Sequence, residues 1–270
     1  MLLIEYYPIN TQLHKLDVRT KLFGFLAITI IAFIFLSPVI NFFLVLISLL
    51  MLIWAKAPIK RLNLVIKPLI PIFIIMLVIT GFTYSPSAFE SEFNRNILFY
   101  LLPDMGAPFT VGGFQLGLTL VMRILTMVLA SSVITFTTQI EDILQLFKKM
   151  KMPYQLAFVI TTGIRFIPTM QKKAEMIQEA QITRGAEIGT GGMIKRIKSF
   201  IPILIPMIVN SLRMSDNLAV AMLNRGFGAM KTSTDLEEIK MTTKDYVISI
   251  IIMIILVSAI WARNKNVGVL

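Results

Sequence analysis

The sequence predicts an all-α integral membrane protein with about five transmembrane helices and two long amphipathic helices that lie outside the bilayer and cross each other. Apolar residues make up 56% of the chain, and the mean hydropathy is +0.78. Residues 22–55 and 68–89 contain no charged side chain, and a membrane span needs roughly 20 predominantly apolar residues. Residues 141–244 instead alternate short apolar blocks with charges, which is typical of helices that lie on a surface.

The first two spans are expected at Leu22–Leu36 and Val39–Trp54, joined at Ser37-Pro38, a dipeptide that favours a turn. Positive charge is retained on the cytoplasmic side of a membrane. We therefore expect a cytoplasmic N-terminus in a bacterial inner membrane and place this turn outside. Basic residues lie before the first of these helices and after the second: Lys15, Arg19 and Lys21, and Lys56, Lys60, Arg61 and Lys67.

The third and fourth spans are expected at about residues 68–84 and 114–137, separated by a net acidic loop that should face outside. A last span is expected at about residues 245–262. The chain therefore divides into a membrane domain with four transmembrane helices (residues 1–140), a cytoplasmic coupling-helix region (141–244), and the last transmembrane helix with the C-terminus (245–270).

Two amphipathic helices of about 30 residues are predicted in the cytoplasmic region, because apolar residues recur there at steps of three and four. This spacing is typical of helices that pack along each other at a shallow crossing angle. The apolar blocks at 152–164 and 200–209 are too short to cross a bilayer. Pro168 lies inside the first helix, and Pro202 and Pro206 inside the second, so kinks are expected there. The stripes are Ile160, Ile164, Ile167, Met170, Ala174, Ile177, Ala180 and Arg184, and Ile197, Ile201, Leu204, Ile208, Leu212, Ser215, Leu218, Met222 and Arg225.

A six-residue pattern occurs at the end of each amphipathic helix. Residues 180–185 read AQITRG and residues 221–226 read AMLNRG, so both copies follow the pattern Ala, any, aliphatic, any, Arg, Gly. A glycine at this place can end a helix in the left-handed conformation. Each copy therefore presents an arginine, Arg184 or Arg225, at the tip of a helix. A pattern this loose can arise by chance, but its position in two similar helices favours a docking site for a soluble partner.

Three further motifs carry a resemblance to a known family. Residues 13–21 read LHKLDVRTK, residues 137–144 read TTQIEDIL, and residues 164–169 read IRFIPT and are followed by the first copy of the repeat at 180–185. These motifs resemble those of the EcfT/CbiQ family and follow the same order along the chain. The first resembles the LHxLDPRTK motif before the first span, with Val18 where proline is usual, and the second resembles the TTSPEDLL motif between the last span of the membrane domain and the cytoplasmic helices. The third resembles the most recognisable stretch of the family. The likeness extends over essentially the whole chain. Members of this family are the transmembrane coupling subunits, or T components, of energy-coupling factor ABC transporters.

The resemblance implies that this chain is a non-catalytic transport subunit that takes part in vitamin or metal-ion uptake. Two ABC-type ATPases would bind Arg184 and Arg225, with Ala180 and Ala221 keeping the helices thin and Gly185 and Gly226 ending them. A small substrate-binding membrane subunit, the S component, would pack on the apolar faces of the same helices. ATP and magnesium would be bound by the ATPases, so no cofactor is expected in this chain.

In agreement with these implied roles, the sequence lacks the motifs that metal or nucleotide binding would need. The chain has no Cys and a single histidine, His14, so no metal site is expected. No phosphate-binding loop occurs, because the nearest glycine cluster, residues 189–195, has the wrong spacing and follows no strand. The net charge of +11 is assigned to topology rather than to nucleic acid.

Arg123 is the one charge inside a predicted span, which makes it a functional candidate by default. No acid lies in another span to pair with it, so the sequence leaves open the alternative of a structural bond to backbone carbonyls or to hydroxyl groups.

Two other classes of protein stay open at this point. A membrane-embedded lipid or prenyl enzyme would need spaced carboxylates, and the pairs at 141–142 and 237–238 lack a second pair for magnesium. A self-sufficient secondary transporter would show inverted repeats with polar groups at mid-membrane, whereas the repeat here lies outside the spans.

Overall fold

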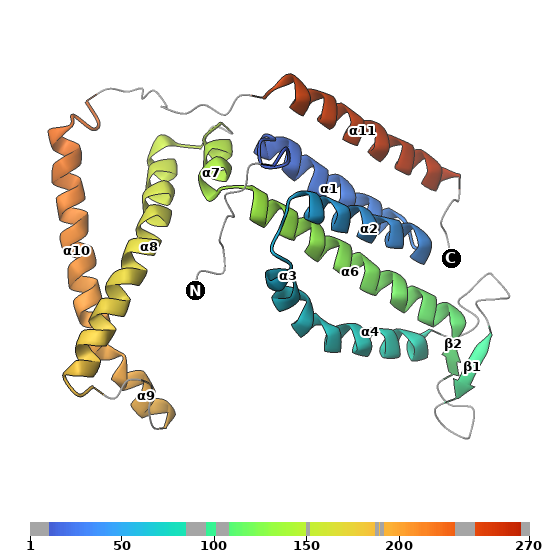
Figure 1. The fold of residues 1–270 in the computed structure, drawn as a ribbon, viewed down its shortest axis with the longest axis horizontal. Helices are drawn as coiled ribbons and strands as arrows, with labels where there is room; N and C mark the ends of the chain where they lie inside the picture. The colour runs from blue at the N-terminus through green and yellow to red at the C-terminus, as the bar shows by residue number, and fades with distance from the viewer. Residues whose placement is uncertain are drawn as a thin grey trace. The chain divides into compact units, whose positions relative to one another are not determined.

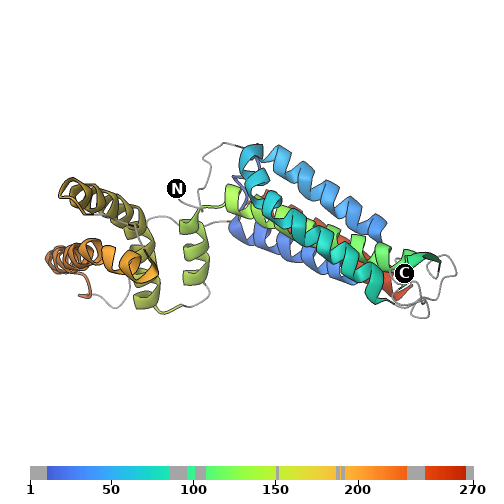
Figure 2. The ribbon, with the colours of Figure 1, turned by 90° about the horizontal axis from the view of Figure 1, so that it is seen from below.

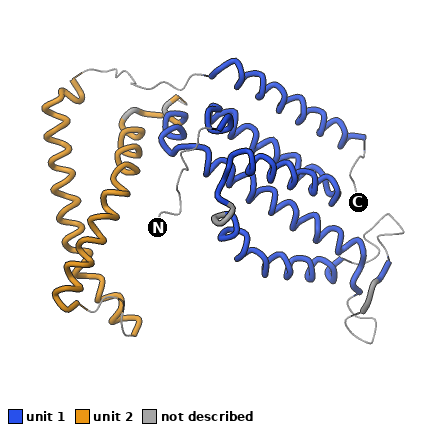
Figure 3. The backbone as a smooth tube through the Cα atoms, viewed as in Figure 1, with its two compact units in different colours: residues 1–146, 239–270 blue, residues 147–238 orange. Residues whose placement is uncertain are grey.

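The computed structural model describes residues 11–84, 96–100, 108–149, 152–186, 189, 192–229 and 241–265. The chain forms two compact units, Met1–Leu146 with Ile239–Leu270, and Phe147–Glu238 (Figure 3). The first unit holds α1 (Val18–Ile34), α2 (Pro38–Trp54), α3 (Ile59–Ile66), η1 (Lys67–Leu69), α4 (Ile70–Thr83), β1 (Ile97–Tyr100), β2 (Pro108–Thr110), α6 (Val111–Thr137) and α11 (Thr243–Asn264). Helix α7 (Ile140–Lys149) leads into the second unit, which holds α8 (Tyr154–Thr183), α9 (Met193–Ser199) and α10 (Ile201–Asn224).

The predicted all-α membrane fold is confirmed. Apart from the helices, the described residues contain one antiparallel pair of short strands, β1 and β2, within the part that the sequence assigned to an external loop. The earlier part of that loop lies outside the described residues. The three-part division of the chain stays a prediction.

Helices α1 and α2 form the predicted hairpin. Asp17 caps the start of α1, because its side chain accepts a hydrogen bond of 3.0 Å from the backbone N–H of Arg19. The turn follows Ile34, and Pro38 occupies the first turn of α2, where a proline needs no N–H partner. The side-chain amide of Asn41 closes this turn by donating to the carbonyls of Phe35 and Ser37.

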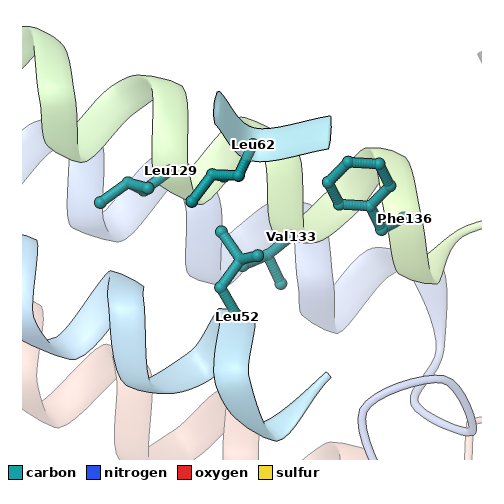
Figure 4. Close-up of a cluster of buried hydrophobic side chains, with 5 residues drawn as sticks. All are labelled: Leu52, Leu62, Leu129, Val133 and Phe136. Carbon is teal, nitrogen blue, oxygen red and sulfur yellow. The ribbon is translucent and has the colours of Figure 1, made fainter. Parts of the chain in front are cut away.

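Helix α6 is the centre of the first unit and packs against α1, α2 and α4, while α11 packs against α1 (Figures 1 and 2). Gly117 permits the close approach of α4, since a Cβ added there would lie 3.3 Å from the Cα of Leu77. One buried cluster joins α2, α3 and α6 and is shown in Figure 4: Leu52, Leu62, Leu129, Val133 and Phe136.

Four helical segments among the described residues are long and apolar enough to cross a membrane: Leu62–Thr83, Val111–Thr137, Met193–Asn224 and Thr243–Asn264. Three of them coincide with the expected third, fourth and last spans. Helices α1 and α2 have 17 residues each and are shorter than a full span. The segment Met193–Asn224 was not expected as a candidate, because the sequence analysis counted the apolar block at 200–209 alone.

The second amphipathic helix is not the continuous rod that the sequence predicts. Helix α9 ends at Ser199 and α10 begins at Ile201, which places Pro202 in the first turn of α10 rather than inside a helix. The missing N–H of a proline costs nothing at that place. Pro168 and Pro206 do lie inside α8 and α10, as predicted.

A carboxylate joins the beginnings of the first and last helices of the first unit. Asp245, which is 1% exposed, accepts a hydrogen bond of 2.9 Å from the backbone N–H of Asp17. The same side chain accepts from the backbone N–H of Thr242 at 2.8 Å and from the Thr242 hydroxyl. Thr242 and Asp245 thus form a capping box at the start of α11.

We predict that Asp245→Ala lowers the free energy of unfolding of the chain by about 1–3 kcal/mol, because it leaves buried N–H groups without acceptors. The thermal unfolding midpoint of the purified chain in detergent measures this loss. Asp216→Ala, on the exposed side of α10, is the matched control and should unfold like the wild type. An unchanged midpoint for Asp245→Ala would contradict the structural role given to this carboxylate.

Candidate coupling site

The end of α8 has the hydrogen-bond pattern of a Schellman cap. Arg184 is the C-cap residue, and Gly185 follows it with φ of +86°, in the left-handed region that favours glycine. The N–H of Gly185 donates to the carbonyl of Ile182 at 2.9 Å, and the N–H of Ala186 donates to that of Gln181 at 2.9 Å. The helix therefore stops at a defined residue and leaves Arg184 at its end.

The end of α10 repeats this cap residue by residue. Arg225 is the C-cap residue, and Gly226 has φ of +69°. The N–H of Gly226 donates to the carbonyl of Leu223 at 3.0 Å, and the N–H of Phe227 donates to that of Met222 at 3.0 Å. The left-handed glycines predicted from the repeated pattern are thus confirmed. Two stretches 41 residues apart end their helices in one geometry.

The surface of these two arginine tips, residues 180–185 and 221–226, is open to a partner. Arg184, Arg225, Ala180 and Ala221 are all exposed. The aliphatic position of the pattern is also exposed, with Ile182 at 52% and Leu223 at 73%. A charge beside an exposed apolar side chain suits a protein interface, where arginine is enriched. No role was predicted for Ile182 and Leu223, although the repeated pattern has an aliphatic residue at their position.

Helices α8 and α10 run antiparallel, as two contacts show. The ring of Phe158, near the start of α8, contacts that of Phe227, just after the end of α10, with ring centroids 5.0 Å apart. Further along α8, the sulfur of Met170 accepts from the hydroxyl of Ser211, in the middle of α10, at 3.3 Å. Figure 1 shows that α8 and α10 run in opposite directions and cross each other.

The tips therefore lie at opposite ends of the helix pair. Arg225 is two residues from Phe227, which contacts Phe158, whereas Arg184 follows Phe158 along α8 by 26 residues. At about 1.5 Å rise per residue this is roughly 39 Å. Two separate partner molecules can each reach one arginine at such a distance.

The crossing of α8 and α10 lies at equivalent positions of the two helices. Met170 and Ser211 are 41 residues apart, as are the two copies of the repeat, and each precedes its arginine by 14 residues. A second contact of 3.8 Å, from the ammonium of Lys173 to the sulfur of Met214, has the same separation of 41. The two helices thus extend about equally from their crossing point to the two tips.

Arg123 lies in the first unit, where it caps the end of α1. It is 8% exposed. Its Nε donates to the carbonyl of Ala32 at 2.9 Å, and its Nη2 donates to that of Phe35 at 3.3 Å, while the guanidinium lies 4.7 Å from the ring centroid of Phe33. The last carbonyls of a helix have no partner within it. These contacts support the structural interpretation of Arg123 over a mechanistic one.

The other residues singled out from the sequence lie in local structure. His14 pairs with the hydroxyl of Thr11 at 2.6 Å. Gly189 lies in the connection from α8 to α9, where its φ is +80°. Within the described parts of the chain, no group of three or more His, Asp or Glu side chains is placed to hold a metal ion.

Comparison with known proteins places the chain among membrane transport proteins. A family profile described as "Cobalt transport protein" (CbiQ) matches residues 10–236. The curated "Energy-coupling factor transporter transmembrane protein EcfT" of Acidaminococcus fermentans is 32% identical over 267 residues, which are 96% of this chain and 95% of that protein. The proteins of the same name from Lactococcus lactis subsp. cremoris and Bacillus subtilis are 30% and 28% identical, covering 97% and 96% of this chain and 98% and 96% of their own lengths.

Proposed function

The chain belongs to the CbiQ family and is a transmembrane component of an energy-coupling factor transporter, and from this premise we propose that it couples ATP hydrolysis by two partner ATPases to substrate uptake. In this proposal Arg184 binds one ATPase and Arg225 the other. The chain itself holds neither nucleotide nor magnesium, which are bound by the ATPases. A further membrane subunit captures the vitamin or metal ion.

The observation that carries this proposal is the pair of identical helix ends, roughly 39 Å apart. ABC-type ATPases act in pairs, and a pair of similar molecules needs two similar docking sites. The planar guanidinium of arginine can bond a carboxylate with two parallel N–H groups, so the contact transmits orientation as well as force. We therefore place an ATPase carboxylate opposite each of Arg184 and Arg225.

The apolar face of α10 supports the place proposed for the substrate-binding subunit. Leu204, Ile208 and Leu212 are 56%, 51% and 62% exposed and line a groove of about 350 Å³. An apolar surface of this kind marks a site of contact with protein or membrane. When nucleotide closes the ATPase pair, the tips move with it and α8 slides against α10, as packed helices do in shear motions. The displaced apolar face then shifts the subunit seated on it.

The composition of the purified complex tests the proposal. Two ATPase chains should be retained by the tagged chain in detergent, and uptake into liposomes should require them. Substrate uptake by this chain alone would overturn the coupling function in favour of a self-sufficient transporter.

We predict that the second unit faces the cytoplasm. Single cysteines at positions 172, 179, 198 and 216, all exposed and placed in a chain without cysteine, should react with a membrane-impermeant maleimide in inside-out vesicles only. A cysteine at exposed position 39, in the first turn of α2, is the matched control and should react in right-side-out cells. Labelling of the four positions in intact cells would contradict the orientation.

A further inference from the structure

The first unit contains a groove between α1 and α11. It has a volume of about 520 Å³, within the range of small-molecule sites of about 300–1,000 Å³. Arg19 and Phe23 of α1 line one side, and Tyr246, Ile250, Met253 and Ile254 of α11 line the other. On α11, Ile250 follows Tyr246 after four residues, and Met253 and Ile254 follow Ile250 after three and four, so they form one face of the helix.

The two walls of this groove are tied together where both helices begin. The hydrogen bond from the Asp17 N–H to Asp245 joins the first turns, and the hydroxyls of Thr20 and Ser249 lie 3.4 Å apart one turn further along. The groove is therefore a built feature of the unit. From Tyr246 to Ile254 it extends about 12 Å along α11 at about 1.5 Å rise per residue.

Arg19 is the charged side chain of this groove and lies at the end where α1 and α11 start. Its Nε atom is buried and has no hydrogen-bond partner among the described residues. A buried N–H group without an acceptor is costly. The Arg19 side chain as a whole is only partly buried, so the groove has a guanidinium group at one end and an apolar channel beyond it.

We propose that this groove binds one anionic phospholipid, with its phosphate at Arg19 and an acyl chain along α11. The start of a transmembrane helix lies at the level of lipid headgroups, where arginine and tyrosine are enriched. Basic pockets between transmembrane helices bind anionic headgroups. A zwitterionic lipid fits less well, because its ammonium group would lie near the charge of Arg19. The site is separate from the two arginine tips and does not depend on the coupling function.

Native mass spectrometry of the full-length chain in detergent tests the site, with phosphatidylglycerol and phosphatidylcholine of identical acyl chains as probes. Phosphatidylglycerol should bind the wild type about tenfold more tightly than phosphatidylcholine, because both lipids carry the phosphate and only phosphatidylcholine brings an ammonium group, which the charge of Arg19 repels. Arg19→Gln should remove that preference, while Arg19→Lys should keep most of it. Lys15→Gln is the matched control, since Lys15 is exposed and does not line the groove.

A second variant tests the apolar part with Arg19 intact. Ile250→Trp fills the groove from a position that is 59% exposed, and it should weaken phosphatidylglycerol binding by about tenfold through the lost chain contact. Equal binding of the two lipids to the wild type, or unchanged phosphatidylglycerol binding in Arg19→Gln, would overturn the proposal. Unchanged binding in Ile250→Trp would also overturn it, because the headgroup would then be held without a chain in the groove.

Discussion

Replacing both arginine tips, as Arg184→Glu together with Arg225→Glu, should abolish ATP-driven substrate uptake and leave the membrane unit folded. In the proposed complex each arginine meets a carboxylate of an ATPase in a site closed to water. Truncating one partner of such a pair typically costs about 2–5 kcal/mol, because the other charge is left without its partner. Glutamate should be worse than alanine, since it places two like charges together.

Alanine variants measure how much each arginine contributes to assembly and uptake. Arg184→Ala and Arg225→Ala should each weaken assembly, and the Ala double variant should already abolish uptake. The charge-matched control is Lys172→Glu with Lys198→Glu, two exposed positions of the same unit that lie outside the tips. Uptake in proteoliposomes at the wild-type rate by the Arg184→Glu, Arg225→Glu variant would show that the tips do not carry the coupling.

Arg123→Leu is expected to have the largest effect on the stability of the chain itself. The guanidinium satisfies the carbonyls of Ala32 and Phe35 at the end of α1, and leucine of similar size cannot donate to them. Hydrogen bonds to charged groups contribute about 1.5–3 kcal/mol each. The variant should therefore lose about 3 kcal/mol or more in free energy of unfolding, measured as a lower thermal midpoint and a lower yield of purified chain.

Arg123→Lys separates structure from mechanism, because lysine keeps a donor and the charge at the same place. This variant should assemble normally and transport at a somewhat reduced rate at most. Arg213→Leu, an exposed arginine on α10, is the control for loss of a cation and should unfold like the wild type. A stable, fully assembled Arg123→Lys complex that transported nothing would assign Arg123 a mechanistic role instead.

The parts of the fold that depend on neighbouring residues were predictable from the sequence. Gly185 and Gly226 end their helices in the left-handed conformation because a helix end is decided within one turn of chain. The long spans were predictable from hydropathy over 20 residues. For Arg123, the absence of acidic residues in the other spans already indicated a structural bond to backbone carbonyls or to hydroxyl groups, and the structure shows the carbonyls of Ala32 and Phe35.

The parts that depend on contacts between distant helices were not predictable in this way. The bond between Asp17 and Asp245 joins residues 228 apart, and periodicity within one helix carries no information about its neighbour. The capping box at Thr242 and Asp245 was the local pattern that could have drawn attention to this carboxylate. Likewise, the break between α9 and α10 follows from Pro202 taking the first turn of a new helix, which the unbroken apolar stripe concealed.

The function of the tips could be inferred only through resemblance, because the groups that they would bind belong to other chains. Arg184 and Arg225 are exposed in this chain by itself. The repeat and its shared cap geometry give the two proposed sites and the distance between them. The identity of the partner comes from the family.

Counting the ATPase chains bound to the tagged protein tests the central claim most directly. Native mass spectrometry of the complex purified from cells that express all subunits should find two ATPase chains on the wild type and on the Lys172→Glu, Lys198→Glu control. The Arg184→Glu, Arg225→Glu variant should carry none while keeping the thermal midpoint of the isolated wild-type chain. Two ATPase chains on that double variant would contradict the assignment of the two helix tips as the coupling site.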